Sequence, residues 1–245
     1  MDPRGKVALI TGGARIGRTI AAELALRGCD VALSYRGSRG SAEESAEEVR
    51  GLGARGAAFQ ADLSRPSAPA ALVRRVRRKL GRLDILVCMA SLYEKTPWEK
   101  LDETVWRANH DANLKSVYLL TLAAAPLLRA GKAGRIVTFA DWLPVSGRPR
   151  YKKFLPYYVS KAGVVGLTES LALELAPAIL VNSVAPGPIL KPPGFSAKAD
   201  RQVREVTPLG RWGGPLEIAR AVLFLIETEF VTGECLRVDG GRHLY

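Results

Sequence analysis

The sequence predicts an α/β fold in which helices cover both faces of one doubly wound parallel sheet. Three observations support this prediction. Short apolar, β-branched runs alternate with longer segments of helical periodicity along the 245 residues, as in βαβ units. A glycine-rich turn directly follows the first apolar run. Hydrophobic residues make up 47% of the chain, enough for a sizeable buried core. We interpret residues 1–245 as a single domain.

The strands are predicted from runs rich in Val, Ile, Leu and Phe that end at Gly, Asp or polar residues. Their order along the chain, with a crossover helix between successive runs, favours the sheet order 3-2-1-4-5-6-7. The predicted strands are Val7–Thr11, Asp30–Tyr35, Ala57–Gln60, Ile85–Cys88, Arg135–Ala140, Leu180–Val184 and Cys235–Val238.

The helices are predicted from apolar residues at helical spacing, as at Ile16, Ile20 and Leu24 after the first strand. A segment as long as 98–129 exceeds one ordinary helix, and we expect it to break near Asp111-Ala112. The Pro- and Gly-rich stretch 186–214 is expected to be a flexible loop over the substrate. The further predicted helices are Ser41–Leu52, Pro66–Leu80, Trp98–Arg129, Tyr157–Ala176 and Pro215–Glu227.

Composition excludes several classes of function. Three cysteines and two histidines at unrelated spacings favour neither disulfides nor a metal site. The longest apolar run, 117–128, is too short to cross a membrane, and no signal peptide precedes the first strand, so we expect a cytoplasmic protein. The net charge is +12, and its densest basic patch is 74–79. Because no aromatic residues are interleaved there, we interpret the patch as a solvated helix face, not a nucleic-acid site.

The turn Thr11–Gly17 lies between the first strand and the first helix, the context of a dinucleotide-binding site in a Rossmann-type fold. Glycines allow the backbone to approach the pyrophosphate, and the helix N-terminus favours its negative charge. Gly12, Arg15, Ile16 and Gly17 are therefore candidate cofactor-binding residues.

The end of the second strand predicts a preference for NADP(H). An NAD site usually has an acidic residue here to accept hydrogen bonds from the ribose, and the sequence after Tyr35 has none. Arg36 and Ser38, with Arg15 or Arg39, can hold a 2′-phosphate instead. After the third strand, Asp62 with Leu63 is the candidate adenine contact.

Tyr157 and Lys161 are candidate catalytic residues because they lie four positions apart and share one face of a predicted helix. A phenol has an ordinary pKa of about 10. A neighbouring ammonium stabilises the phenolate, so we expect Lys161 to lower the pKa of Tyr157.

These features resemble the short-chain dehydrogenase/reductase family over essentially the whole chain. The resemblance implies that Tyr157 is the general acid in reduction, that Lys161 binds the nicotinamide ribose and that Asn113 holds a water. It also implies cofactor contacts from Ala90, Pro186, Gly187 and Ile189, and a homotetramer whose interface includes the helices around 113–129 and 157–176. The matching motifs are Thr11–Gly17, Asp62-Leu63, Asn113-Leu114-Lys115, Tyr157-x-x-x-Lys161, Pro186-Gly187, Thr232-Gly233 and Val238-Asp239-Gly240-Gly241.

The chain departs from the family pattern at four places. The glycine-rich turn is one residue shorter than usual and lacks its middle glycine. Cys88-Met89 stands where two asparagines are usual, and Asp141 stands where a catalytic serine is usual. The interval from there to Tyr157 is longer than usual and contains Ser146, a second candidate for the serine role.

Asp141, Arg15, Ala90-Ser91 and Tyr35-Arg36 together resemble the pteridine reductases and their bacterial relatives. In that subgroup an aromatic residue stacks the pterin against the nicotinamide, and Tyr93 occupies this place, although it could be a plain wall residue. A flat amino-oxo heterocycle offers N–H donors to a carboxylate and a π face to an aromatic ring. The candidate substrate residues are Ser91, Tyr93, Asp141 and Trp142.

The sequence thus predicts an NADPH-dependent reductase that transfers hydride to a C=O or C=N bond, with a pterin- or dihydrofolate-like small molecule favoured. One alternative is a 3-oxoacyl carrier-protein reductase, whose acidic partner would suit the positive charge. An alternative of another class is a non-catalytic NADP-binding regulator, which the shortened turn favours and the set of Tyr157, Lys161 and Asn113 opposes.

Overall fold

A parallel sheet of seven strands forms the centre of the molecule, in the order β3-β2-β1-β4-β5-β6-β7. The computed structural model describes residues 1–147 and 151–244. The predicted sheet order is confirmed, and the predicted strands differ from the observed ones by two residues at most. The strands are β1 Val7–Thr11, β2 Asp30–Tyr35, β3 Gly56–Gln60, β4 Ile85–Cys88, β5 Gly134–Phe139, β6 Ile179–Pro186 and β7 Cys235–Val238.

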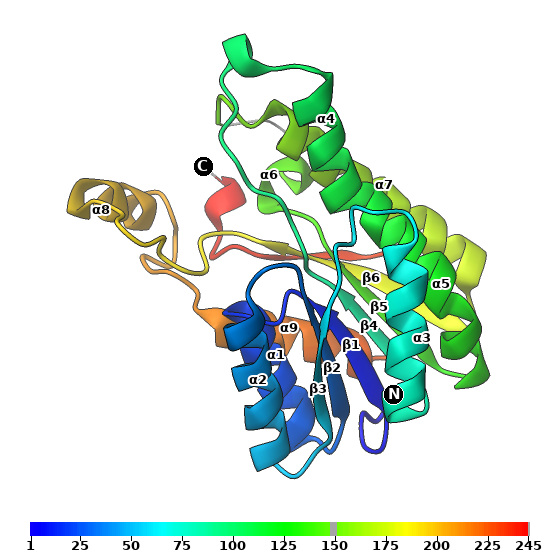
Figure 1. Ribbon diagram of the computed structural model, residues 1–245. Helices are drawn as coiled ribbons and strands as arrows, with labels where there is room; N and C mark the ends of the chain where they lie inside the picture. The colour runs from blue at the N-terminus through cyan, green and yellow to red at the C-terminus, as the bar shows by residue number, and fades with distance from the viewer. Residues whose placement is uncertain (148–150, 245) are drawn as a thin grey trace.

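Helices cover both faces of the sheet (Figure 1). Helices α1, α2 and α9 lie on one face, and α3, α5 and α7 lie on the other. The described helices are α1 Ile16–Leu26, α2 Arg39–Gly51, α3 Ala68–Leu80, η1 Trp98–Lys100, α4 Glu103–His110, η2 Asp111–Lys115, α5 Ser116–Ala130, α6 Trp142–Val145, α7 Leu155–Leu175, α8 Ala197–Glu205, α9 Pro215–Glu227 and η3 Arg242–Leu244.

Each face of the sheet has a large hydrophobic core of its own. Ile20 of α1 and Val222 of α9 pack in the first core, and Leu72 of α3 and Leu120 of α5 pack in the second. Strand β1 lies between the two cores and is buried at every position, as expected for a strand covered by helices on both sides. The sheet thereby holds the carboxyl ends of β1, β2, β4, β5 and β6 at one edge of the molecule.

The segment 98–129 is interrupted earlier than expected. Leu101 and Asp102 separate η1 from α4, and the Asp102 carboxylate caps α4 by accepting a hydrogen bond from the backbone N–H of Val105 at 2.8 Å. Around Asp111, where we expected a break, the chain continues as the π-helical turn η2 into α5. Such turns are frequent at functional sites.

The stretch 186–214 is not entirely irregular, because it contains α8. The Ser196 hydroxyl caps this helix by accepting from Ala199 N–H. Helix α8 has no buried residue and few apolar ones, so the Pro- and Gly-rich composition around it concealed the helical spacing of Ala199 and Val203 in the sequence. In Figure 1 it projects from the body of the molecule.

None of the helices in the described ranges is both long and apolar enough to span a membrane.

Candidate active site

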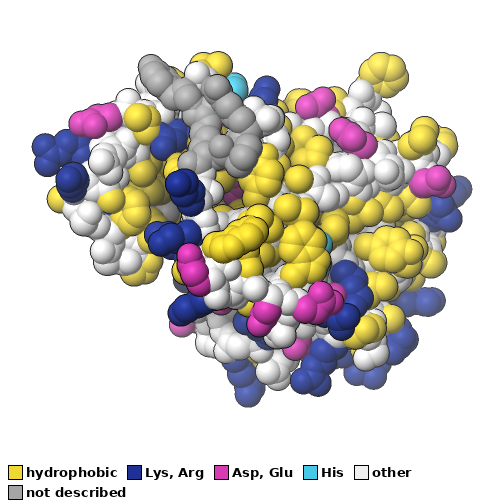
Figure 2. All heavy atoms as spheres, turned by 90° about the horizontal axis from the view of Figure 1, so that it is seen from above, with side chains coloured by type: hydrophobic (Ala, Val, Ile, Leu, Met, Phe, Trp, Pro, Cys, Tyr) yellow, Lys and Arg dark blue, Asp and Glu magenta, His cyan; other side chains and the backbone are white. Residues whose placement is uncertain are grey.

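A large cleft of about 1460 Å³ opens at the carboxyl ends of the strands. This edge of a doubly wound sheet is where such folds bind ligands. Figure 2 looks down on it and shows hydrophobic side chains exposed along the middle, with Lys and Arg side chains beside them. The cleft brings together residues from the glycine-rich turn, the ends of β2, β4, β5 and β6, the start of α7 and the 186–214 stretch.

Nearly all the predicted site residues line this cleft, and two do not. Gly17 and Asn113 are absent from the lining. The predicted residues in the lining are Gly12, Arg15, Ile16, Arg36, Ser38, Asp62, Leu63, Ala90, Ser91, Tyr93, Asp141, Trp142, Tyr157, Lys161, Pro186, Gly187 and Ile189.

The glycine-rich turn is tight, and two of its glycines are required for different structural reasons. Gly12 has φ of +89°, in the left-handed region. Gly17 has no room for a side chain, because a Cβ there would lie 2.0 Å from the carbonyl oxygen of Gly12. Gly17 therefore serves close packing of the turn on α1, and its contact with the cofactor stays a prediction. Arg15 takes the left-handed φ of +54° at the N-cap of α1, a conformation that a non-glycine residue rarely adopts.

The end of β4 is fastened to the turn by Thr11. Its Oγ1 accepts hydrogen bonds from the backbone N–H groups of Met89 at 2.9 Å and Ala90 at 3.0 Å. Cys88, at the first of the two positions where asparagines are usual, is buried, and burial raises the pKa of its thiol to about 12. Although Cys88-Met89 replaces the usual asparagines, hydrogen bonds from the backbone N–H groups of Met89 and Ala90 to Thr11 hold this segment beside the turn.

The adenosine end of the cleft fits a 2′-phosphate. The exposed Arg36 lies in the lining with Arg15. Ser38, also in the lining, is the N-cap of α2, and its side chain makes no capping bond. A helix N-terminus with two guanidinium groups and an uncommitted hydroxyl suits an anion. Opposite them, hydrogen bonds from Ser64 to Asp62 lower the pKa of that carboxyl, so it remains an acceptor at neutral pH.

The nicotinamide end is shaped by the close approach of two strand ends. Gly187 N–H donates to the carbonyl of Val238 at 2.9 Å. A Cβ on Gly187 would lie 2.5 Å from Cβ of Asp239, so only glycine fits. Pro186, Gly187 and Ile189 then line the cleft side by side. The described residues contain no group of three or more His, Cys, Asp or Glu side chains that could hold a metal ion.

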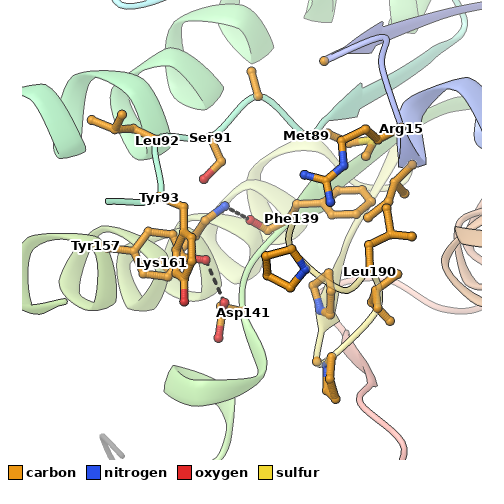
Figure 3. A pocket seen from close by; sticks show the side chains of 18 of the residues that line it. Arg15, Met89, Ser91, Leu92, Tyr93, Phe139, Asp141, Tyr157, Lys161 and Leu190 are labelled. Carbon is orange, nitrogen blue, oxygen red and sulfur yellow. Dashed lines mark hydrogen bonds between the residues drawn. The ribbon is translucent and has the colours of Figure 1, made fainter. Parts of the chain in front are cut away.

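Tyr157, Lys161 and Asp141 lie close together in the cleft (Figure 3). The Tyr157 hydroxyl donates a hydrogen bond of 2.7 Å to Oδ2 of Asp141. Lys161 Nζ donates to the carbonyl of Phe139 at 2.7 Å and lies 6.0 Å from the centre of the Tyr157 ring. Asp141 follows β5 and caps α6, because its Oδ1 accepts from Leu143 N–H at 2.9 Å.

Burial and mutual charge set the protonation of these three groups. Burial raises the pKa of Asp141, although hydrogen bonds from Leu143 N–H and Tyr157 and the charge of Lys161 oppose the rise. Burial lowers the pKa of Lys161 to about 8, and the negative charge of Asp141 counteracts this. The pKa of Tyr157 is well above its usual value because of burial and the neighbouring Asp141. The expectation that Lys161 lowers it was therefore wrong for this arrangement, since Asp141 is the charge in direct contact.

Asn113 binds protein groups through its side chain, and the water contact that the family resemblance implies for it stays a prediction. It lies in the π-helical turn η2 and is buried. Its Oδ1 accepts from Leu92 N–H at 2.6 Å, while Nδ2 donates to the Leu92 carbonyl at 3.0 Å and to Ser160 Oγ at 3.0 Å. Its side chain thus joins the segment before Tyr93 to α7, next to Tyr157.

An aromatic wall flanks the proton donor. Tyr93 stacks on Phe154 with ring centres 4.8 Å apart and meets Tyr157 edge-on at 4.7 Å. Phe154 already covers one face of Tyr93. No motif in the sequence points to Phe154, although it lies only three residues before Tyr157. The same is true of Tyr151, which meets Trp142 edge-on at 6.2 Å, and of Arg242, which lines the cleft from the end of the chain.

Asp141, not Ser146, occupies the expected serine position. Ser146 is the C-cap of α6, where its hydroxyl donates to the Leu143 carbonyl at 2.7 Å. It is absent from the lining of the cleft. The alternative that the sequence left open is therefore decided in favour of Asp141.

Comparisons with known proteins cover the whole chain. The family model described as enoyl-(acyl carrier protein) reductase matches residues 13–243. A 3-oxoacyl-[acyl-carrier-protein] reductase FabG of Staphylococcus aureus (strain Mu50) is 35% identical in an alignment of length 245 that covers 98% of each chain. The protein of the same name from Escherichia coli (strain K12) is 33% identical over the full length of both. The solved structure of a short chain dehydrogenase from Burkholderia cenocepacia J2315 in complex with NADP is 35% identical, has a TM-score of 0.91 and covers 99% of each chain.

Proposed function

The chain belongs to the short-chain dehydrogenase/reductase family, and from this premise we propose which bond its site reduces and which substrates it selects. As a member of this family it is an NADP(H)-dependent oxidoreductase, as the sequence predicted. The enzymatic relatives also remove the reason to interpret the chain as a non-catalytic regulator. We propose that the protein reduces a C=O or C=N bond placed beside Tyr157, in a flat heterocycle of the pterin class.

One observation supports this substrate class above all, the hydrogen bond from Tyr157 to Asp141. A serine in this place would donate a neutral hydrogen bond to a carbonyl oxygen. An ionised carboxylate only accepts, and it repels the negative charge that develops on a reduced carbonyl oxygen. Asp141 therefore favours a substrate that presents an N–H group beside the reducible bond, or one that takes up a proton there, and amino-oxo heterocycles do both.

Tyr157, Asp141 and Lys161 each have a separate part in the proposed reaction. NADPH supplies the hydride when bound. Tyr157, which keeps its proton because its pKa is high, donates that proton to the substrate nitrogen or oxygen, so that C=N becomes CH–NH. Asp141 in its acid form is near enough to return a proton to the phenolate, and burial increases the fraction of that form. Lys161 holds positive charge beneath the pair, at 6.0 Å from the phenol ring.

The aromatic wall and the preceding segment complete the proposed site. Tyr93 has one face on Phe154 and can place its other face against a planar ring. Ser91 lies in the cleft lining beside them, and its hydroxyl donates to Asn113 Oδ1 at 3.2 Å. Trp142 continues the wall beyond Asp141.

A 3-oxoacyl carrier-protein thioester is the second candidate substrate, and a specific observation favours it. The relatives at 33% and 35% identity over the full chain carry this name. These comparisons support the thioester class better than they support the pterin class. Asp141 opposes it, because a buried carboxylate would stand beside the thioester carbonyl as that oxygen becomes negative.

Steady-state oxidation of NADPH with a matched panel decides between the two classes. The panel contains dihydrobiopterin, dihydrofolate, a β-oxoacyl thioester and an uncharged β-keto ester. The proposal predicts the highest kcat/KM with a dihydropterin, and a higher value with the thioester would establish the second candidate. If the protein binds NADPH but reduces none of the four compounds, both candidate substrate classes are rejected.

A homotetramer is the assembly that we propose. Helices α5 and α7 carry apolar side chains that are exposed in the single chain, among them Tyr118, Leu122, Leu155 and Leu173. Gly166 of α7 has open space where a Cβ would be, which permits close approach of another helix. Exposed apolar side chains on these two helices are what a subunit interface would bury.

A further inference from the structure

We propose that Arg242 is an anion-binding residue of the substrate cleft, and therefore that the natural substrate carries a carboxylate or phosphate group away from its reducible bond. This inference rests on the proposed function, because it assigns a further group of the substrate to the same cleft. Arg242 lines the cleft together with Trp142 and Tyr151.

The backbone holds Arg242 in a fixed place. It begins the short helix η3, directly after the Gly240-Gly241 turn. The buried carboxylate of Asp239 accepts hydrogen bonds from the backbone N–H groups of Gly241 and His243, each at 3.0 Å. His243 Nδ1 lies 2.8 Å from the same carboxylate. Three contacts to one buried acid thus fasten the end of the chain at the rim of the cleft.

Two aromatic side chains of the cleft contact the guanidinium of Arg242. Its Cζ lies 5.7 Å from the centre of the Trp142 ring, and Trp142 directly follows Asp141. Its Nη2 donates to the Tyr151 hydroxyl at 3.1 Å. A substrate with its reducible bond at Tyr157 would therefore extend along Trp142 towards Arg242.

The hydrogen-bonding capacity of Arg242 is only partly used. Its Nη1 is buried and has no hydrogen-bond partner among the residues that the structure describes. Within that same part of the chain, no carboxylate forms an ion pair with it. A buried donor without a partner is costly, and so is a partly buried charge without a counter-ion.

Arg135 shows how this fold treats an arginine whose role is structural. Its Nε donates to the carbonyl of Ile226 at 3.0 Å and its Nη2 to that of Thr228 at 3.0 Å. Its Nη1 reaches the carbonyls of Ala133 and Gly134. Arg135 is thus satisfied by main-chain oxygens on every nitrogen, whereas Arg242 keeps a charge and a donor that no residue in the described ranges satisfies.

More cationic than acidic side chains line the cleft, so its charge favours an anion. Lys95 and Lys152 line the cleft with Arg242. Of the acidic residues in the lining, Asp141 is engaged by Tyr157 and Asp62 by Ser64, and Glu205 belongs to the projecting helix α8. The planar fork of a guanidinium matches the two oxygens of a carboxylate or a phosphate.

Arg242→Gln tests the inference, and Arg237→Gln is its matched control. Glutamine keeps a hydrogen-bond donor and removes the charge. Arg237 is exposed, lies on β7 five residues earlier, and donates to the Val145 carbonyl at 3.3 Å outside the cleft lining. Two substrate pairs differ in charge away from the reducible bond. Dihydrofolate carries carboxylates that dihydrobiopterin lacks, and acetoacetyl coenzyme A carries phosphates that ethyl acetoacetate lacks.

The expected result is a change in selectivity. A hydrogen bond to a charged group contributes about 1.5–3 kcal/mol, which is about 10- to 100-fold in affinity. In Arg242→Gln, KM for the anionic member of the active pair should rise by that factor relative to KM for the neutral member. A change in the dihydrofolate pair would identify the bound anion as a carboxylate, and a change in the acetoacetyl coenzyme A pair would identify it as a phosphate. Arg237→Gln should leave the ratio as in the unmodified protein, and added salt should lower the preference of the unmodified protein for the anion.

Equal changes for both members of a pair, or no change for either, would overturn the inference while leaving the proposed reductase function intact. If the unmodified protein reduced neither pair, the proposed function would fail. Calorimetry on the complex with NADP would then decide the inference. Folate should bind more tightly than biopterin, and it should lose that advantage in Arg242→Gln; equal binding of the two would overturn the inference.

Discussion

The Tyr157 hydroxyl donates its proton in a 2.7 Å hydrogen bond to Oδ2 of Asp141. The other oxygen of this carboxylate caps α6 through Leu143 N–H, so the helix cap fixes the direction of the acid. A substrate atom that is to receive the proton must therefore replace Asp141 as the partner of the phenol, or Asp141 must itself carry a proton. This relationship links the substrate specificity of the site to its protonation.

Tyr157→Phe should abolish most turnover without preventing NADPH binding. The substitution removes the proton donor and leaves the ring in contact with Tyr93. General acid–base groups contribute about 10²–10⁴-fold, and kcat should fall within that range. Fluorescence titration with NADPH provides the binding control. Turnover equal to that of the unmodified protein would remove Tyr157 from the role of proton donor.

The activity should depend on the charge of Lys161. Because its pKa is lowered to about 8, the ammonium form is complete below that value and disappears as the pH rises through it. The kcat/KM for NADPH, which reports groups of the free enzyme, should therefore fall above about pH 8.

Asp141→Asn should move this fall to lower pH. The negative charge of Asp141 raises the pKa of Lys161, and asparagine removes that charge while it can still accept from Leu143 N–H. The pH at the midpoint of the kcat/KM profile is compared between the variant and the unmodified protein, and the absolute rates do not enter this comparison. A midpoint that stays in place or moves to higher pH would show that another group titrates.

Arg36→Asp should reverse the preference between cofactors. The substitution removes a cation from the 2′-phosphate end of the cleft and adds an acceptor for ribose hydroxyls. Kd for NADPH should rise by about 10- to 100-fold, and that for NADH should fall relative to it. Arg74→Asp makes the same change of charge on the exposed face of α3 and should leave the ratio unaltered. A preference for NADH in the unmodified protein would contradict the assignment of this end.

Light scattering at micromolar concentration should give the mass of four chains. Leu122 of α5 is 51% exposed in the single chain, and Leu122→Glu should reduce that mass by placing a charge in the apolar surface. Leu26 is 62% exposed on α1, on the opposite face of the sheet, and Leu26→Glu is the control. A monomer mass for the unmodified protein would contradict the proposed assembly.

Sequence periodicity was sufficient for the sheet because its strands are apolar and bounded by polar residues. The strand β1, buried on both faces, is a continuous run from Val7 to Thr11. Helix α8 was not found in this way because it is short, has few apolar residues and lies in a stretch rich in Pro and Gly. The four-residue helix α6 depends on the Asp141 cap and proline geometry, and it is too short to show a period.

The sequence predicted which residues form the site better than it predicted the contacts between them. Motif spacing identified Tyr157, Lys161 and Asp141, since each motif lies at a strand end or on one helix face. It could not show that Asn113 is fully engaged with Leu92 and Ser160, because the chain distances between them are long. Motif spacing also could not show that Arg242 contacts Trp142, because these residues are far apart in the sequence and meet only in the folded protein.

The role of Asp141 in substrate selection is tested most directly by Asp141→Ser. The measurement is kcat/KM for dihydrobiopterin and for an uncharged β-keto ester, in the unmodified protein and in the variant, because the ratio reports differential transition-state binding. Serine can donate to a carbonyl oxygen and brings no charge. We predict that the ratio of pterin to keto-ester activity is high in the unmodified protein and falls by about 10-fold or more in the variant. An unchanged ratio would contradict the account, because Asp141 would then not contact the substrate.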